Sequence, residues 1–219
     1  MTAAAWEAVA DAAGIGAGTT VLDLGCGHGA FCAFAVRRGA IVHGVDLEPD
    51  GIAEALDAVP GADVRLGMME SLPWADDSFD VVTSFNALQY ALDTEMALTE
   101  ASRVAHPDGR IVICKWGPPA ENEFFAFLLS IGAGGVREEQ LPVTDPVEDA
   151  IRATRFQVVA TGEVPAPIEI ADDAALEVSL SRAGVGSVGA TREAAPYRQA
   201  DGSYRFENRQ RYWILGGAR

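Results

Sequence analysis

Two carboxylates and a short glycine loop stand within the first quarter of the sequence. Asp23 lies in an apolar run, and Gly25 and Gly27 follow it directly. Asp46 ends a second apolar run about 20 residues after the first glycine, where an acid can accept hydrogen bonds from both hydroxyls of a ribose. Backbone N–H groups at a helix start beside such a loop can hold an anionic or polar ligand group. The spacing therefore predicts a binding site for an adenosine-type ligand.

Strands and a helix must position these residues. The run 21–24 predicts a buried strand that stops at the glycines, and residues 30–38 suit a helix with basic residues in its last turn. Residues 41–45 predict a second strand, which places Asp46 at its tip. Further strands are expected at 64–66, 81–85 and 110–115, and further helices at 51–59 and 94–104. This alternation indicates an α/β fold with a parallel, doubly wound sheet, which binds ligands at the carboxyl ends of its strands.

The second half of the sequence predicts a less regular series of elements. Helices are expected at 123–131, 146–154 and 172–182, a loop over 132–145, and strands at 156–164 and 204–215. No internal repeat or low-complexity tract interrupts the 219 residues, so we interpret them as one domain.

The composition excludes several classes of function. Nucleic-acid affinity depends on basic residues that neutralise phosphates, so a formal net charge of −16 argues against a nucleic-acid partner. Cys26, Cys32 and Cys114 are odd in number and lack metal-ligand spacing, so we expect no metal site and reduced thiols in a cytoplasmic protein. No basic leader precedes the first helix, so no signal peptide is expected. No apolar run reaches the length that membrane insertion requires.

Four sequence blocks follow one another in an order that is specific as a set. They are VLDLGCGHG (21–29), VDLEP (45–49), LPWADDSFDVV (72–82) and EASRVAHPDGRIVI (100–113). Together they resemble the motifs of class I S-adenosylmethionine-dependent methyltransferases. The likeness is greatest to the small-molecule branch, methyltransferase 11-like, that includes the ubiquinone/menaquinone-type enzymes. The resemblance runs from residue 19 to residue 117, and residues 118–219 match only loosely.

The resemblance implies both a fold and an activity. The fold would be Rossmann-like and doubly wound, with three α/β/α layers around a mostly parallel seven-stranded sheet of order 3-2-1-4-5-7-6 and an antiparallel C-terminal edge hairpin. Within a single domain, 1–219, we expect a cofactor-binding core at 1–116, a lid insertion at 117–150 and a substrate-side and edge-strand region at 151–219. The activity would be methyl transfer to a small-molecule acceptor by in-line displacement, driven mainly by proximity and orientation. The oligomeric state stays open, with a homodimer as one option.

The resemblance also implies which residues hold S-adenosyl-L-methionine. Asp23 would orient the amino group of its methionine part, and Asp46 would hold the ribose. The remaining contacts would come from the glycine loop, the residue after Asp46, the adenine loop and the end of the fourth strand: Gly25, Cys26, Gly27, Leu47, Met68, Met69, Ser84 and Phe85. Met68 departs from the family, because relatives often have there an Asp that accepts from the adenine amino group. Either Glu70 replaces that acid or the amino group faces water.

Candidates for the acceptor side lie after the fourth and fifth strands and near the N-terminus. They are Trp6, Asn86, Gln89, Tyr90 and Trp116, and each has a plain alternative in capping or packing. A general base is needed only when the acceptor is a weakly acidic hydroxyl or a carbon acid. No catalytic residue is assigned. His28 in the glycine loop is a candidate base, and loop filling explains it equally well.

Two other hypotheses stay open. An NAD(P)-dependent oxidoreductase is one, because Gly25, Gly27 and Ala30 also fit the spacing G-x-G-x-x-A. Asp23 just before the loop and the single nucleotide-binding half argue against it. A non-catalytic or repurposed S-adenosylmethionine-binding protein is the other, because clear acid and base residues are missing.

Overall fold

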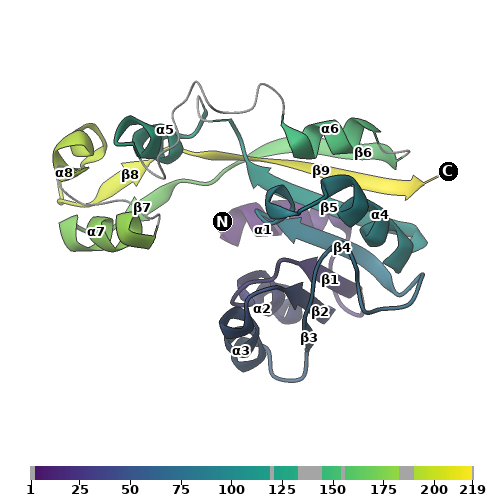
Figure 1. Cartoon of the computed structure of the whole chain (residues 1–219). Coiled ribbons are helices and arrows are strands. Elements are labelled where there is room, and N and C mark those ends of the chain that lie inside the picture. Colours follow the sequence, from purple (N-terminus) through teal and green to yellow (C-terminus); the bar gives the residue numbers. More distant parts are fainter. Residues whose placement is uncertain (1–2, 119–120, 133–144, 154–155, 183–189, 219) are drawn as a thin grey trace.

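A seven-stranded sheet of order β3-β2-β1-β4-β5-β9-β6 runs through the chain (Figure 1). The computed structural model describes residues 3–118, 121–132, 145–153, 156–182 and 190–218. The strands of this sheet are β1 (Thr20–Leu24), β2 (Ile41–Asp46), β3 (Asp63–Leu66), β4 (Phe79–Phe85), β5 (Ala105–Trp116), β6 (Phe156–Pro165) and β9 (Arg209–Ala218). The pairs among β1 to β5 are parallel, and β9 runs antiparallel to both β5 and β6. The predicted Rossmann-like, mostly parallel sheet and its strand order are therefore confirmed.

Helices cover both faces of the sheet, because successive strand residues point to opposite sides. Val21 of β1 packs in one apolar cluster and the adjacent Leu22 in another, so each face needs its own cover. The first face carries α1 (Ala3–Ala13), α2 (Ala30–Arg37) and α3 (Pro49–Ala58). The second carries α4 (Thr94–Val104) and α6 (Pro146–Ala153), and the 3-10 turn η1 (Leu88–Tyr90) lies beside them. These helices and the sheet form the predicted α/β/α layers.

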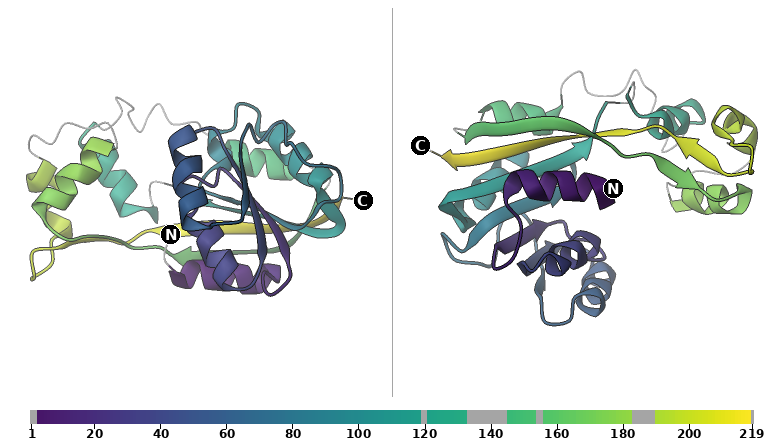
Figure 2. Two further views of the ribbon diagram at one scale, coloured as in Figure 1. Left: turned by 90° about the horizontal axis from the view of Figure 1, so that it is seen from below. Right: turned by 180° about the vertical axis from the view of Figure 1, so that it is seen from behind.

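A smaller group of elements extends beyond one end of the sheet, and we call it the outer lobe (Figures 1 and 2). Its elements are α5 (Glu123–Ser130), β7 (Ile168–Ile170), α7 (Asp173–Arg182), α8 (Ala190–Glu193), the 3-10 turn η5 (Ala195–Tyr197) and β8 (Tyr204–Phe206). β7 and β8 form a separate antiparallel pair. The lobe has its own apolar cluster, in which Phe127, Leu176, Tyr204 and Phe206 are fully buried.

The C-terminal segment differs from the expected single strand over 204–215. It divides into β8 and β9, which belong to different sheets. Asn208 lies between them, and its buried side chain accepts a hydrogen bond from the N–H of Phe124 at 3.1 Å, which ties the break to α5. Consequently the antiparallel pair of β6 and β9 is connected through the outer lobe and not by a tight turn.

Two further boundaries differ from expectation. β5 begins at Ala105 and not at residue 110 as expected, and its pairing with β4 shifts register within the added segment. The expected lid at 117–150 includes residues 133–144, which lie outside the described residues. Its two helices pack in different places, α5 in the outer lobe and α6 in the cluster that contains α4. No helix in the described part of the chain is long and apolar enough to cross a membrane.

Candidate functional site

A cavity of about 320 Å³ opens where the chain leaves β1, β2, β3 and β4, at the carboxyl edge of the sheet. Ligands bind doubly wound sheets at this edge. The lining residues are Gly25, Val45, Asp46, Leu47, Glu48, Gly67, Met69, Asn86, Ala87 and Tyr90. Two of these side chains are carboxylates and none is cationic, so the cavity suits a positively charged ligand.

The carboxylate of Asp46 is held in place by backbone groups at the tip of β2. Its Oδ2 accepts a hydrogen bond from the N–H of Gly27 at 2.7 Å, and its Oδ1 accepts from the N–H of Glu48 at 2.9 Å. Each carboxylate oxygen has a further lone pair, so Asp46 can accept more hydrogen bonds from a ligand. The acid predicted to hold a ribose is thus oriented before any ligand binds.

Gly25 is required by backbone conformation and by a close neighbour. Its φ is +68°, in the left-handed region that favours glycine, and a Cβ at this position would lie 2.3 Å from the Cβ of Ala87. This close approach brings the loop after β1 against the segment after β4. Gly27 has a φ of +51° and open space around its Cα, so its requirement is conformational.

Asp23 is a buried acid of β1 that is not among the lining residues, and only 2% of its surface is exposed. Its Oδ1 accepts a hydrogen bond from the hydroxyl of Thr83 at 2.7 Å, and the Sγ of Cys32 lies 3.9 Å from its Oδ2. Burial raises the pKa of Asp23 to about 7 against the opposing effect of the Thr83 hydrogen bond, and the charge of Asp46 adds to the rise. A cationic group placed nearby would favour its ionised form.

The segment after β4 contributes one wall of the cavity. Asn86 and Tyr90 line it, and the Nε2 of Gln89 donates a hydrogen bond to the backbone carbonyl of Asn86 at 3.0 Å. The Oδ1 of Asn86 and the Oε1 of Gln89 are buried and lack a hydrogen-bond partner among the described residues. Tyr90 is 77% exposed at the rim.

Two of the three residues expected around adenine line the cavity. Leu47 and Met69 line the cavity, whereas Met68 is 37% exposed and is not among the lining residues. Glu70 holds the start of α4, because its Oε1 accepts from the N–H of Leu92 at 2.6 Å and from that of Asp93 at 3.3 Å. One oxygen of its carboxylate, Oε1, is therefore occupied with backbone groups.

Three further expected cofactor residues are not among the residues that line the cavity. Cys26 is buried, and a Cβ at Gly44 would lie 2.9 Å from its Sγ, so the thiol fills the space beside that glycine. Ser84 is buried, and its hydroxyl has no partner within the described structure. The ring of Phe85 packs on that of Phe31 with centroids 4.1 Å apart.

The remaining candidates lie away from the lining. Trp6 packs its ring against the rings of Phe31 and Phe34, which anchors α1 on α2. Trp116 is half-buried at the end of β5, opposite Gln210 of β9. The His28 side chain is 71% exposed, and its Nδ1 lies 2.9 Å from a carboxylate oxygen of Glu54 on α3.

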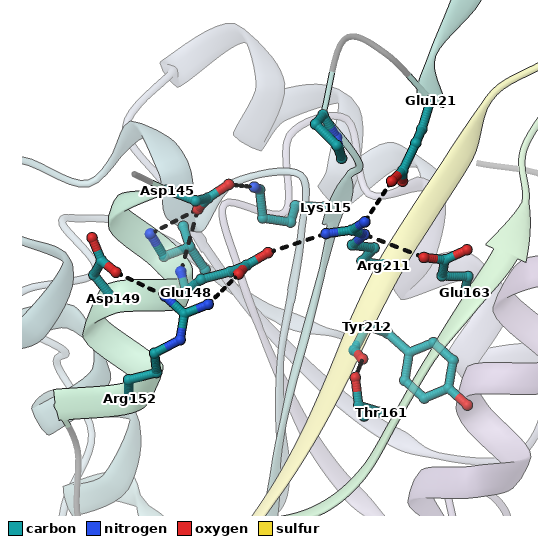
Figure 3. A network of polar contacts seen from close by, with 12 residues as sticks. Lys115, Glu121, Asp145, Glu148, Asp149, Arg152, Thr161, Glu163, Arg211 and Tyr212 are labelled. Carbon is teal, nitrogen blue, oxygen red and sulfur yellow. Dashed lines mark hydrogen bonds and ion pairs between the residues drawn. The ribbon is translucent and has the colours of Figure 1, made fainter. Parts of the chain in front are cut away.

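An ion-pair network lies at the ends of β5 and β9, over the face that α6 covers (Figure 3). Lys115 contacts the carboxylate of Asp145, and burial lowers the pKa of this lysine. Arg211 reaches three carboxylates, those of Glu121 at 2.6 Å, Glu163 at 3.3 Å and Glu148 at 3.5 Å. Lys115 and Arg211 are therefore both already neutralised by acids.

Four lining residues were not selected from the sequence. They are Val45, Glu48, Gly67 and Ala87. Val45 and Glu48 lie beside Asp46 within the block VDLEP, so this block could have identified them as site residues. The small residues Gly67 and Ala87 give no such signal, because their role is to let two loops approach one another.

Comparison with known proteins identifies the part of the chain that carries the site. Residues 22–113 match the family described as Methyltransferase domain. The match covers less than half of the chain. The matched segment contains every residue that lines the cavity.

Individual relatives agree with this assignment. The chain is 36% identical over 124 residues to the demethylmenaquinone methyltransferase of Mycolicibacterium paratuberculosis, covering 55% of this chain and 51% of that relative. It is 35% identical over 117 residues to the malonyl-[acyl-carrier protein] O-methyltransferase of Halorhodospira halophila, covering 51% of this chain and 40% of that relative. The chain thus spans about half, or less, of these curated relatives.

A solved structure extends the likeness of fold beyond the matched segment. The YcgJ protein of Bacillus subtilis superposes with a TM-score of 0.67 at 20% sequence identity, covering 100% of both chains. At this identity the likeness concerns the fold alone.

Proposed function

We propose that this chain is an S-adenosyl-L-methionine-dependent methyltransferase that moves a methyl group to a small-molecule acceptor. The observation that carries the proposal is the preorganised carboxylate of Asp46 at a cavity with two acids and no cation in its lining. The proposed cofactor carries a sulfonium and an amino group, both positive, and two ribose hydroxyls that donate hydrogen bonds. An acid-lined cavity matches both features.

In this proposal, different residues of the matched segment contact different parts of the cofactor. Asp46 accepts from the ribose hydroxyls, Leu47 and Met69 pack on the adenine, and Gly25 borders the methionine part, whose amino group Asp23 orients. When bound, the cofactor supplies a methyl group activated by the sulfonium. The protein contributes by holding donor and acceptor aligned and close, which can lower the barrier by several kcal/mol.

The dinucleotide alternative fits the site less well. NAD(P) carries a pyrophosphate, which binding sites stabilise with helix N-termini and cations. The lining of the cavity offers no cation, and Lys115 and Arg211 are engaged with carboxylates. A cytoplasmic location stays a prediction, and the oligomeric state stays open.

Titration calorimetry with S-adenosylhomocysteine and with NADH tests the proposal. We expect binding of the former only, and we expect Asp46→Ala to weaken it by about 2 kcal/mol or more, roughly thirtyfold, because charged hydrogen bonds are lost. Asp50→Ala removes an exposed acid on α3 and serves as the matched control. Tight NADH binding without any response to S-adenosylhomocysteine would contradict the proposal, as would an unchanged affinity in Asp46→Ala.

A further inference from the structure

Glu70 connects two stretches of chain that follow different strands of the sheet. It belongs to residues 67–71, which we call the β3 loop, and it bonds to residues 86–93, which we call the β4 segment. Its Oε1 accepts hydrogen bonds from the N–H of Leu92 at 2.6 Å and from that of Asp93 at 3.3 Å. Hydrogen bonds to an ionised acceptor are stronger than those between neutral groups, so the shorter of these bonds is a firm connection.

Both stretches line the cavity, and they meet at the glycine loop. Met69 of the β3 loop is a lining residue, as are Ala87 and Tyr90 of the β4 segment. A Cβ at Gly25 would lie 2.3 Å from the Cβ of Ala87 and 3.8 Å from the Cε of Met69. A ligand that occupies the cavity therefore touches both stretches that Glu70 connects.

The second half of the β4 segment is largely exposed. Leu88 is buried, whereas Tyr90 and Leu92 are 77% and 84% exposed. The segment ends at Asp93, which is the N-cap residue of α4. Exposed stretches with few buried apolar contacts open at a low cost in free energy. The bonds to Glu70 therefore have a large part in deciding where the rim of the cavity lies between the buried turn and α4.

We propose that Glu70 is a positioning residue that couples cofactor binding to the acceptor side of the cavity. This inference rests on the proposed function above. The cofactor packs on Met69 and so favours the arrangement in which the N–H groups of Leu92 and Asp93 are bonded to Glu70. Cofactor binding thereby orders Tyr90 and its neighbours at the rim before the acceptor arrives. By linkage, an acceptor bound to the ordered rim also tightens the cofactor.

Hydrogen exchange on the full chain tests the coupling. Exchange of the backbone amides of Leu92 and Asp93 is measured by NMR with and without saturating S-adenosylhomocysteine. We expect the ligand to slow exchange at both amides by about tenfold or more in the parent protein. Glu70→Met keeps the length of the side chain without its oxygens, so the ligand should change exchange there by less than about twofold. Glu70→Gln keeps an oxygen that accepts from these N–H groups and should restore most of the effect.

Glu123→Met is the matched control. Oε2 of Glu123 accepts a hydrogen bond from the N–H of Glu207 at 2.7 Å in the outer lobe, and neither residue lines the cavity. This variant should show the same slowing by the ligand at Leu92 and Asp93 as the parent protein. A purely structural role of Glu70 would speed exchange with and without ligand alike and would leave the slowing by the ligand intact.

The parent protein alone already decides part of the question, whether or not the Glu70 variants fold. If S-adenosylhomocysteine binds and leaves exchange at Leu92 and Asp93 unchanged, this inference is wrong and the proposed function stands. The same conclusion follows if the ligand slows exchange equally in the parent protein and in Glu70→Met. If S-adenosylhomocysteine does not bind the parent protein, the proposed function and this inference both fail.

Discussion

Asp23 is the residue whose ionisation the fold opposes most clearly. Burial raises its pKa from 3.8 to about 7. Between these two values the unfolded chain has released the proton that the folded chain retains, so the free energy of unfolding falls as pH rises from about 4 to 7. We expect a loss of roughly 2–4 kcal/mol over that range from this group. Denaturant titrations at several pH values measure it.

The Asp23→Asn variant isolates this contribution. Asn keeps an oxygen that accepts from Thr83 and cannot ionise, so the variant should show a flatter dependence of unfolding free energy on pH. Other acids whose pKa the fold lowers, such as Asp63 and Glu100, contribute stability that is lost on acidification, and they are the same in both proteins. Identical pH profiles for the parent and Asp23→Asn would show that Asp23 titrates normally.

A substitution at Met68 tests how the adenine amino group is recognised. Because Oε1 of Glu70 accepts from the N–H groups of Leu92 and Asp93, we expect this amino group to face water. Met68→Asp should then add a hydrogen-bond acceptor. The binding of S-adenosylhomocysteine should become tighter by about 1–2 kcal/mol, five- to thirtyfold. If Glu70 serves the amino group, the new carboxylate would lie beside it and weaken binding. Calorimetry on a folded variant distinguishes the two outcomes.

At the scale of elements, the segment 117–150 connects the carboxyl end of β5 to the start of β6 through α5 and α6. We predict that it closes over the acceptor site when cofactor and acceptor are bound, as loops at the ligand edge of enzymes commonly do. Limited proteolysis of the free protein, the cofactor complex and the complex with both ligands measures this. Cleavage within 117–150 should slow in the last state, and equal cleavage rates in all states would exclude a closing segment.

At the scale of the whole molecule, the outer lobe and the central sheet have separate apolar cores. Phe127→Ala opens a cavity in the lobe and should cost about 3–5 kcal/mol of unfolding free energy, with cofactor affinity little changed. Phe31→Ala is the matched change in the central core, where Phe31 packs on Phe85. Phe31→Ala should lower the unfolding free energy by a similar amount and should also weaken the binding of the cofactor. Denaturant unfolding and calorimetry on both variants compare them, and equal losses of affinity would mean that lobe and site are coupled.

The sequence alone determined the central elements and the acid that carries the site. Alternating apolar runs and glycines predicted β1, α2 and β2, because burial on both faces and a tight turn leave clear patterns. Asp46 was found because its distance from the glycines follows from the length of one strand–helix–strand unit.

The tertiary structure decided what local pattern could not encode. The segment 204–215 has continuous strand character, and only the contact of Asn208 with Phe124 shows where it changes sheets. Ala87 enters the site because its Cβ fills the space that Gly25 leaves, a contact across 62 residues of sequence. The unpartnered oxygens of Asn86 and Gln89 arise in the same way, since hydrogen-bond satisfaction depends on every element packed around an atom.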